Sequence, residues 1–536
     1  MQTKTTGDDD DGIELVRRGS SRADVALSDF GRFYTSDDQM KQALNPATVA
    51  AHLIPCFELA ASLVPKKYHS TTLVKYQATA GMRLLPLDEQ DAIYNALYQG
   101  LIEDSRFVFS GMQRKDIETL SGELEGLYGA IAANYLRGIV RADLRLIAAT
   151  NNRTDNNSNN DDDDDDDGSW SSIVGALDMG GASTQLVFLP ARQTEQEHEH
   201  QNDDVRERRD SNGEARMFPD KSGVLQGDSF FSSSYLSYGV DRFRERFWDT
   251  LVEDWRQETF IRYDKDDQFA SLSREVDNPC ANKGYKTQWQ GITLVGTGDT
   301  AACVRHTQRL IPHPHHSSNH TTSSHSHTVG GRTHPPIRGS FLAMSLYFFS
   351  LDSLRVLSIG DAKETLNKVW PTPTLHELSN TLNGLCSRPY QELLKLEHSF
   401  TSQEVLPHRC FETVYMVTLL KDGFGFDPNE RSITYTFLVN GTEVEWTLGM
   451  ALTLYNNNQK MSDDIDATVQ HNSHVQNNFM VLDREDKSFS QESSASGHVI
   501  RMCGNEDQQI VGTEDFYSNT SSASFPSLRA SECTAS

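Results

Sequence analysis

The sequence has 536 residues and a formal net charge of -27, from 76 aspartates and glutamates against 49 lysines and arginines. This length predicts two or three compact units, and the negative charge argues against a nucleic-acid backbone as the main partner. The 7 cysteines are too few for a disulfide scaffold, but they allow a few bridges. No stretch approaches the roughly 18 apolar residues of a membrane span, and the N-terminus has no apolar signal region.

Low-complexity segments interrupt the chain. Residues 151–168 contain a run of aspartates, 192–222 mix charges with almost no large apolar residue, and 313–336 are rich in His, Ser, Thr and Pro. Residues 456–536 form a polar tail. Such compositions bury too little surface to offset the entropy of ordering. We therefore predict three surface-loop insertions and a mostly disordered tail, in addition to a disordered N-terminus over residues 1–26.

The first predicted elements lie in the N-terminal third. Leu73–Gln77 reads as a short strand that runs into a Thr-Ala-Gly turn. Asp88–Ile102 is expected to be a helix, because Ile93, Leu97 and Leu101 fall on one helical face.

Further elements follow around a glycine pair. Glu125–Leu136 reads as a helix with Leu127, Ile131 and Tyr135 roughly on one face. The apolar runs 175–178 and 186–188 flank two glycines, which predicts a strand, a tight turn and a second strand. Helices interleaved with short β-rich runs predict a mixed α/β protein.

The glycine pair lies in the segment ALDMGGASTQ, residues 176–185. Asp178 ends an apolar strand, and the glycines let the backbone turn tightly and bring N–H groups close to an anion. Ser183, Thr184 and Gln185 add neutral donors and acceptors at the same turn. This composition suits a phosphate-cradling loop whose carboxylate holds a hydrated divalent cation. An ordinary hairpin turn explains the D-x-G-G core equally well.

Two more segments combine polar residues with element ends. In residues 77–85, Arg83 could face a phosphate, but an arginine that packs its stem and pairs with a local carboxylate is the favoured reading of that segment alone. In residues 120–129, Glu123 and Glu125 lie near a predicted helix start. Glutamates there commonly do no more than cap the helix and interact favourably with its dipole. The alternative is that Glu125 acts as a general base.

Taken together, these segments resemble the apyrase, or nucleoside triphosphate diphosphohydrolase, family of nucleoside phosphatases. The matching blocks, in order, are ATAGMRLLP, SGELEGLYGAIAANYL, ALDMGGASTQLVF, SYLSYGVDRFRERF, NPCANKGY, VGTGDTAAC, HRCFETVYMVTLLKDGFGF and VEWTLGMAL. The resemblance runs from about Leu27 to Tyr455, interrupted by the insertions.

The resemblance implies roles for individual positions. Glu125 would be the general base for water, and Ser183 and Gln185 would orient that water. Asp178 would hold waters on Mg²⁺ or Ca²⁺. The phosphate- and nucleotide-binding positions that it implies are Thr79, Arg83, Gly180, Gly181, Ala182 and Ser183.

The implied reaction is hydrolysis of the terminal phosphate of nucleoside di- or triphosphates, by in-line attack of water and without a covalent intermediate. The implied fold is a two-domain α/β protein of the actin-like ATPase superfamily, built from RNase H-like domains with the nucleotide in the cleft between them. One domain would span residues 27–121 and 437–455, and the other 122–436. The base would be sandwiched by an aromatic side chain that the sequence does not select among Tyr347, Phe348 and Phe349.

One block of the family pattern is missing. Relatives have an earlier phosphate loop of the form D-[AG]-G-S-[ST]-G-[ST]-R, expected upstream of Leu27; residues 19–22 read GSSR and lack its aspartate and second glycine. We expect either a natural protein that begins further upstream or a catalytically impaired relative that still binds nucleotide. A superfamily phosphotransferase, such as a sugar kinase, is a further alternative, since it could share the D-x-G-G turn.

The resemblance also bears on the compartment. Pro86 and the sequence of residues 422–426 favour the Golgi-type branch, and the family implies disulfides Cys280–Cys303 and Cys386–Cys410, which need an oxidising lumen. We expect a location in the lumen of the secretory pathway, or membrane anchoring in a full-length form, with no signal visible in the printed sequence. Glycosylation sequons compatible with a lumen begin at Asn152, Asn156, Asn319, Asn440 and Asn519.

The histidines of the third insertion could bind a transition metal. Their irregular spacing in a Ser/Thr/Pro-rich stretch favours a solvated loop instead. These residues are His313, His315, His316, His320, His325, His327 and His334.

Overall fold

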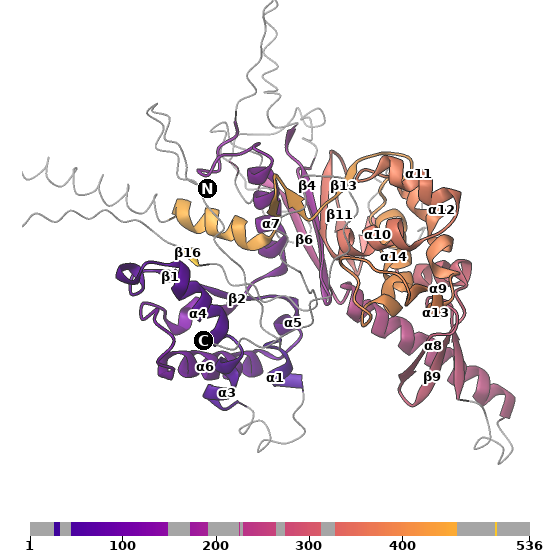
Figure 1. Cartoon of the computed structure of the whole chain (residues 1–536), viewed down its shortest axis with the longest axis horizontal. Helices are drawn as coiled ribbons and strands as arrows, with labels where there is room; N and C mark the ends of the chain where they lie inside the picture. Colours follow the sequence, from indigo (N-terminus) through magenta and orange to yellow (C-terminus); the bar gives the residue numbers. More distant parts are fainter. Residues whose placement is uncertain are drawn as a thin grey trace, which may run out of the picture.

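The structure is a computed structural model that describes residues 26–32, 44–147, 172–190, 225, 229–263, 274–311, 327–457 and 499–500. Residues 1–25 and the first two predicted insertions lie outside these ranges, as do residues 313–326 and most of the tail. Within the described residues, helices alternate with short strands (Figure 1), which confirms a mixed α/β protein.

The helices are α1 (Asp29–Arg32), α3 (Pro46–Ala51), α4 (Ile54–Leu63), α5 (Ala80–Arg83), α6 (Leu87–Glu103), α7 (Gly122–Leu136), α8 (Val240–Tyr263), α9 (Thr300–Leu310), α10 (Leu346–Leu357), α11 (Asp361–Val369), α12 (Leu375–Cys386), α13 (Tyr390–Leu393) and α14 (Arg409–Thr418), with a last helix over residues 446–457. Short 3-10 turns are η1 (Lys66–Tyr68), η2 (Arg114–Asp116) and η6 (Leu406–His408), and η7 (Leu419–Gly423) is a π-helical turn.

The strands are β1 (Leu73–Val74), β2 (Tyr76–Ala78), β3 (Ile117–Thr119), β4 (Gly175–Met179), β5 (Ser183–Phe188), β6 (Phe231–Leu236), β7 (Glu275–Asn278), β8 (Lys286–Trp289), β9 (Ile292–Gly296), β10 (His327–Val329), β11 (Arg332–His334), β12 (Phe341–Ser345), β13 (Ile433–Tyr435), β14 (Leu438–Val439), β15 (Thr442–Glu443) and β16 (Val499–Ile500).

The largest sheet has the order β13-β12-β4-β5-β6. Strands β4, β5 and β6 are antiparallel, and β12 and β13 are added in parallel on the other side of β4. This order and these directions are those of an RNase H-like domain, as expected. Strand β5 begins at Ser183, three residues before the predicted start at Leu186, because Ser183 to Gln185 pair with β6 and, in part, with β4. Ser183, Thr184 and Gln185 therefore lie on a strand and not in the turn.

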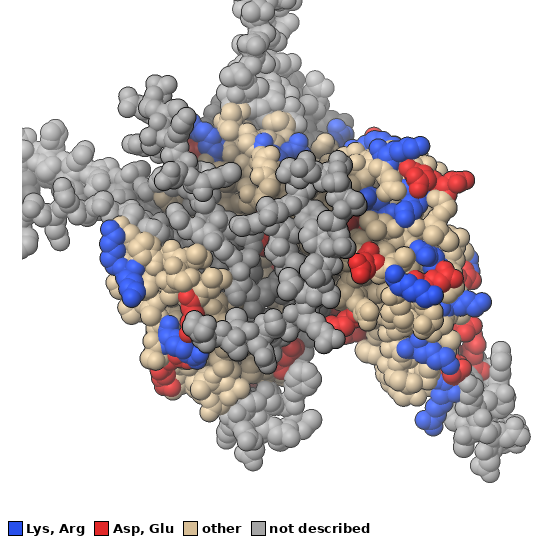
Figure 2. All heavy atoms as spheres, in the orientation of Figure 1, with Lys and Arg blue, Asp and Glu red and all other residues tan. Residues whose placement is uncertain are grey.

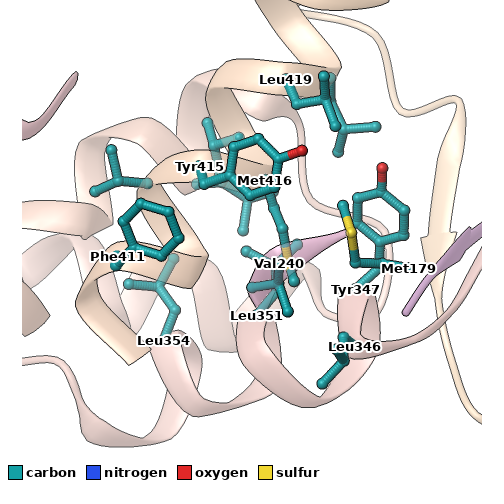
Figure 3. Packing of buried hydrophobic residues seen from close by; sticks show 14 of the residues in the cluster. Met179, Val240, Leu346, Tyr347, Leu351, Leu354, Phe411, Tyr415, Met416 and Leu419 are labelled. Carbon is teal, nitrogen blue, oxygen red and sulfur yellow. The ribbon is translucent and has the colours of Figure 1, made fainter. Parts of the chain in front are cut away.

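Helices cover both faces of this sheet. On one face, α7 and the helix over residues 446–457 pack against alternate residues of β4, β5 and β12, such as Ala176, Val187 and Met344. On the other face, the neighbouring residues of the same strands pack against α8, α10, α12 and α14. Figure 3 shows part of this second core, where Met179 lies beside side chains of α10 and α14. The two-residue period of each strand thus separates two cores.

The N-terminal elements have a core of their own. Its buried residues come from α3, α4 and α6 and from the short strands β1, β2 and β3, and these elements lie together in Figure 1. Helix α6 buries Ile93, Leu97 and Leu101, as predicted. The strand predicted over residues 73–77 is divided at Lys75, whose ammonium donates to Asp116 at 2.7 Å. The residue bounds proposed for the two domains stay predictions.

Helix α7 begins three residues before its predicted start at Glu125, because Ser121 caps it and accepts from the Leu124 amide at 3.2 Å. Its buried residues are mostly small, including Gly126 and Gly129. Of the predicted stripe, Ile131 is buried, and Leu127 and Tyr135 are half-buried against the same core. A Cβ on Gly126 would lie 2.7 Å from the Val187 side chain. Glycine is needed there because the helix axis comes unusually close to the sheet.

The third insertion is partly folded. Residues 327–334 form the β10–β11 hairpin, with Val329 and His334 buried, so the prediction of a surface loop up to residue 336 is wrong for this part. Val329 is buried in the core, and this single apolar residue gives little signal in a segment of otherwise polar composition. Among the described residues, no group of three or more His, Cys, Asp or Glu could hold a metal ion; the other histidines of the tract lie outside them.

Charges are interspersed on the visible surface. Figure 2 shows lysine and arginine side chains mixed with aspartate and glutamate over the lobe that carries α11 and α12. This face has no large basic patch of the kind that a nucleic-acid phosphate backbone would need. In the part of the chain that the structure describes, no helix is long and apolar enough to cross a membrane.

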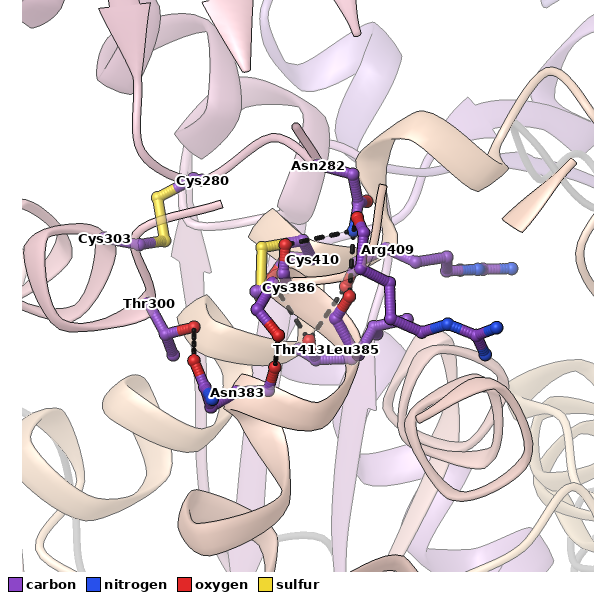
Figure 4. The surroundings of a disulfide bond; sticks show 12 residues. Cys280, Asn282, Thr300, Cys303, Asn383, Leu385, Cys386, Arg409, Cys410 and Thr413 are labelled. Carbon is purple, nitrogen blue, oxygen red and sulfur yellow. Dashed lines mark hydrogen bonds between the residues drawn. A yellow bond between two sulfur atoms is a disulfide. The ribbon is translucent and has the colours of Figure 1, made fainter. Parts of the chain in front are cut away.

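Two disulfides join the elements around α9, α12 and α14. They pair Cys280 with Cys303 and Cys386 with Cys410, as the resemblance implies. The amide of Asn282 lies beside the second disulfide (Figure 4) and donates to three carbonyls, of Leu385 at 2.8 Å and of Cys386 and Arg388 at 3.2 Å. This side chain therefore links the segment after the first disulfide to the segment around the second.

We expect Asn282→Ala to lower the free energy of unfolding by about 2 kcal/mol, because buried carbonyls would lose their donor. Urea denaturation monitored by circular dichroism measures this change. Thr300→Ala is the matched control, since it removes an exposed hydrogen bond to Asn383 in the same region and should cost less than about 0.5 kcal/mol. Equal costs for the two variants would contradict the proposed link.

Candidate active site

The first turn of α7 carries a buried carboxylate. Glu125 is 6% exposed, although a glutamate in this position of a helix is ordinarily solvated. Its Oε2 accepts from Arg83 Nη2 at 2.9 Å and from Gln185 Nε2 at 3.1 Å. The Glu125 carboxylate thus accepts hydrogen bonds from α5 of the N-terminal elements and from β5 of the large sheet.

Strand β5 supplies the neutral donors and acceptors. Because side chains alternate along a strand, Ser183 and Gln185 face α7 while Thr184 faces the opposite core. Gln185 Nε2 also donates to Ser183 Oγ at 2.9 Å and to Ser234 Oγ on β6 at 3.1 Å. Arg83 Nη2 donates to Ser183 Oγ at 3.0 Å. Ser183 and Gln185 are therefore held beside Glu125 by a closed set of hydrogen bonds.

Asp178 lies directly opposite Gln185 in the ladder between β4 and β5. It is 8% exposed, and its carboxylate accepts from the Ser345 hydroxyl and from the Met179 amide. No lysine or arginine of the described residues forms an ion pair with it. A buried carboxylate without a cationic partner fits a divalent cation, which would offset the cost of its burial.

The turn between β4 and β5 is fixed through its carbonyls. Gly180 O accepts from Val240 N at 3.0 Å, Gly181 O accepts from Asp241 N at 2.9 Å, and Ala182 O accepts from Ser237 N at 2.8 Å. Within the described ranges, the amides of Gly181 and Ala182 donate to no backbone carbonyl. The turn is thus anchored to the segment at the start of α8, and the Gly181 and Ala182 amides are the candidate donors to an anion.

Burial sets the protonation of both carboxylates. The pKa of Glu125 is raised to about 7, mainly by burial and also by the charge of Asp178, while the charge of Arg83 and its hydrogen bond act in the opposite direction. Burial also raises the pKa of Asp178, with hydrogen bonds from Ser345 and Met179 acting in the opposite direction. A carboxyl group whose pKa lies near neutrality is suited to accept and release a proton at physiological pH.

Two further predicted site residues, Arg83 and Thr79, lie at α5. Arg83 is committed to protein groups, because Nη1 also donates to Leu120 O at 2.9 Å; the carboxylate with which it pairs is Glu125. The Thr79 carbonyl accepts from Met82 N and Arg83 N, and its hydroxyl does not cap α5.

The aromatic candidates for the base sandwich are buried. Tyr347, Phe348 and Phe349 are 0%, 8% and 4% exposed and belong to the core beneath the sheet. The Tyr347 hydroxyl lies 3.2 Å from Thr184 Oγ1, which donates to Asp178 O at 2.7 Å. Tyr347 therefore supports the strand that carries Asp178.

Sequence reasoning missed two serines that touch the site, Ser234 and Ser345. Ser234 stands in a run of three serines before Tyr235, and its register opposite Gln185 depends on a strand pairing that the sequence does not specify. Ser345 follows the apolar run FLAM, and an apolar run that ends in a serine was the one available signal.

Comparison with known proteins identifies a family and several relatives. Residues 41–471 match the GDA1/CD39 (nucleoside phosphatase) family. Ectonucleoside triphosphate diphosphohydrolase 8 of Bos taurus is 26% identical over 429 residues, covering 77% of this chain and 73% of that protein. The Golgi apyrase of Saccharomyces cerevisiae is 25% identical over 423 residues, covering 75% of this chain and 59% of that protein. Among solved structures, nucleoside triphosphate hydrolases from Neospora caninum align over 79% of this chain and 81% of that chain, at 13% identity and a TM-score of 0.48.

Proposed function

Because the chain belongs to the GDA1/CD39 nucleoside phosphatase family, we propose that it hydrolyses the terminal phosphate of nucleoside di- and triphosphates with a divalent cation, Mg²⁺ or Ca²⁺. The observation that carries this proposal is the buried Glu125 carboxylate, held within hydrogen-bonding distance of Gln185, whose amide also binds Ser183. These three side chains converge near the glycine turn between β4 and β5.

In this reaction Glu125 is the general base. Ser183 and Gln185 orient a water molecule, Glu125 takes its proton, and the oxygen attacks the terminal phosphorus in line with the bridging oxygen. The bond to that bridging oxygen breaks, and inorganic phosphate and the shortened nucleotide leave. Such general-base catalysis contributes about 100- to 10,000-fold in rate.

The turn and Asp178 would handle the phosphate charge. The Gly181 and Ala182 amides donate to the phosphate oxygens, where preorganised donors stabilise the charge that develops. Asp178 would hold a divalent cation through its bound waters, and when bound this cation supplies positive charge next to the phosphate oxygens. Arg83 contributes indirectly, because its guanidinium pairs with Glu125.

A second function is that of a relative that binds nucleotide without hydrolysing it. It would apply to a protein that lacks the first phosphate loop of the family, which the 536 printed residues do not contain. Loss of a single preorganised donor can cost on the order of 100-fold in rate. This alternative predicts stabilisation by nucleotide while phosphate release stays at background.

We place the protein in the lumen of the secretory pathway, in the Golgi or as a membrane-anchored form. Two disulfides support this location, since they persist in oxidising compartments. The similarity to a Golgi apyrase and to ectonucleoside triphosphate diphosphohydrolases supports it as well.

Phosphate release from nucleoside di- and triphosphates, with Mg²⁺, with Ca²⁺ and with a chelator, tests the main proposal. Melting curves with the same nucleotides test binding separately. Release that depends on a cation supports hydrolysis. Thermal stabilisation without release supports the second function. If nucleotide causes neither stabilisation nor phosphate release, both proposals are contradicted.

We expect kcat/KM to rise with pH through about 7. The pKa of Glu125 is raised to about 7, and the base acts only when ionised, so the rate falls as pH drops below this value and levels off above it. Initial rates between pH 5 and 9 at a fixed free cation concentration measure this limb. A profile that stays flat down to pH 5 would show that Glu125 is not the base.

A further inference from the structure

Ser345 ends strand β12 next to the strand of Asp178. The two strands are parallel, with Met344 paired to Asp178 and Ser345 paired to Met179. The Ser345 hydroxyl donates to the Asp178 carboxylate. Ser345 thus lies one position past Met344, the residue paired with Asp178 on this side, whereas Gln185 is paired with Asp178 on the other side.

The backbone of Ser345 has a conformation that favours glycine. Its φ is 55° and its ψ is -132°, in the region where a Cβ meets its own backbone. Non-glycine residues persist in such conformations when the surroundings hold them there, often at functional sites. A glycine at this position would relieve the strain and remove the CH2OH side chain.

The hydroxyl does not serve the helix that it precedes. Ser345 is the N-cap residue of α10, where a serine usually accepts from the backbone of the first turn, but its side chain makes no capping hydrogen bond. The hydroxyl is used on Asp178 instead. Helix capping therefore does not explain why a serine stands at this strained position.

We propose that Ser345 is a positioning residue that holds the Asp178 carboxylate in the orientation in which it binds the hydrated cation. The inference rests on the proposed function, in which Asp178 holds that cation. Removal of a side chain that orients a metal-binding carboxylate typically weakens cation affinity about 10- to 100-fold. Ser345 acts on the cation through Asp178 and does not itself touch the substrate.

The test uses the full chain with its disulfides formed, and the variants Ser345→Ala and Ser345→Gly. Both remove the hydroxyl, but only glycine also relieves the backbone. Mn²⁺ is titrated in the presence of a methylene-bridged analogue of adenosine diphosphate, and the cation-dependent rise in melting temperature is followed by scanning fluorimetry. We expect the Mn²⁺ concentration for half of this rise to increase at least about tenfold in both variants. The matched control Ser353→Ala removes a buried hydroxyl of α10 that donates to Ser350 O, and it should leave that concentration unchanged.

Each other outcome overturns the inference. An unchanged Mn²⁺ dependence in both variants means that the hydroxyl does not position Asp178, and a change in alanine but not in glycine assigns the effect to the backbone. If the unsubstituted chain gains no stability from Mn²⁺, the inference also fails. In that case phosphate release from adenosine and uridine diphosphates, measured alongside, decides whether the proposed function fails with it.

Discussion

Replacing Glu125 with glutamine is expected to reduce cation-dependent phosphate release by about 1,000-fold, to near background, while nucleotide binding persists. Glutamine has nearly the same shape and can still accept from Arg83, but it cannot take a proton from water. Turnover with nucleoside diphosphate and triphosphate, together with nucleotide-induced shifts in melting temperature, measures the two effects separately. Retained turnover in this variant would contradict the assignment of Glu125 as base.

The control for this variant is Glu123, two positions earlier in the same helical turn. Its side chain is 41% exposed and pairs with Arg332, which is 54% exposed, at 2.7 Å. Glu123→Gln should leave turnover within about twofold, because exposed ion pairs contribute about 0 to 1 kcal/mol. A large loss in Glu123→Gln would point to a general effect on α7 and not to base chemistry.

Arg83→Gln is expected to give the second large effect. The side chains of Arg83 and Glu125 are 14% and 7% exposed, and breaking a buried pair on one side leaves an uncompensated charge that costs about 3 kcal/mol or more. Since Arg83 lowers the pKa of Glu125, its loss should move that pKa upward from about 7. We therefore expect turnover at pH 7 to fall at least about tenfold and to recover partly at pH 9.

The same pKa gives the stability of Arg83→Gln a definite pH dependence. The folded-state pKa of Glu125 lies above its ordinary value, so protonation favours the folded protein and the unpaired carboxylate is most costly at high pH. Urea denaturation at pH 6 and pH 8.5 should show the larger loss at pH 8.5. Arg332→Gln, which removes the exposed pair on the same helix, should show less than about 1 kcal/mol at either pH. An Arg83→Gln profile whose acidic limb does not move would mean that Arg83 acts on phosphate and not on Glu125.

The sequence predicted elements well where large apolar residues repeat. Helix α6 is found from Ile93, Leu97 and Leu101, and they are its buried residues. In α7 the same reasoning found a helix and residues that pack on its core, but it missed the closest contact with the sheet, because glycines and alanines form that contact and carry little signal of hydrophobicity. The start of β5 was missed for a related reason, since Ser183 and Gln185 are polar residues buried by hydrogen bonding.

The sequence predicted which residues belong to the site, but it did not predict the contacts between them. The pair of Arg83 and Glu125 joins residues 42 positions apart, and the bond from Arg83 to Ser183 spans 100 positions. No local pattern reports such distances. Alone, the segments of Arg83 and Glu125 favoured an ordinary structural role and the D-x-G-G segment left the two interpretations equal; the order of several motifs favoured the chemical role. The carboxylate with which Arg83 pairs is the proposed base, Glu125. The structural role predicted for Arg83, pairing with a carboxylate, and its proposed effect on catalysis therefore rest on the same contact.

The direction of β4 and β5 has a consequence for the two insertions beside them. The chain enters β4 at Gly175, after the first insertion, and leaves β5 at Phe188, before the second, whereas the glycine turn joins the other ends of these strands. A five-residue strand separates the two ends by about 16 Å. The strand ends that lead to the two insertions are therefore remote from the turn, and a change in the length or charge of an insertion need not alter the register that sets Asp178 opposite Gln185.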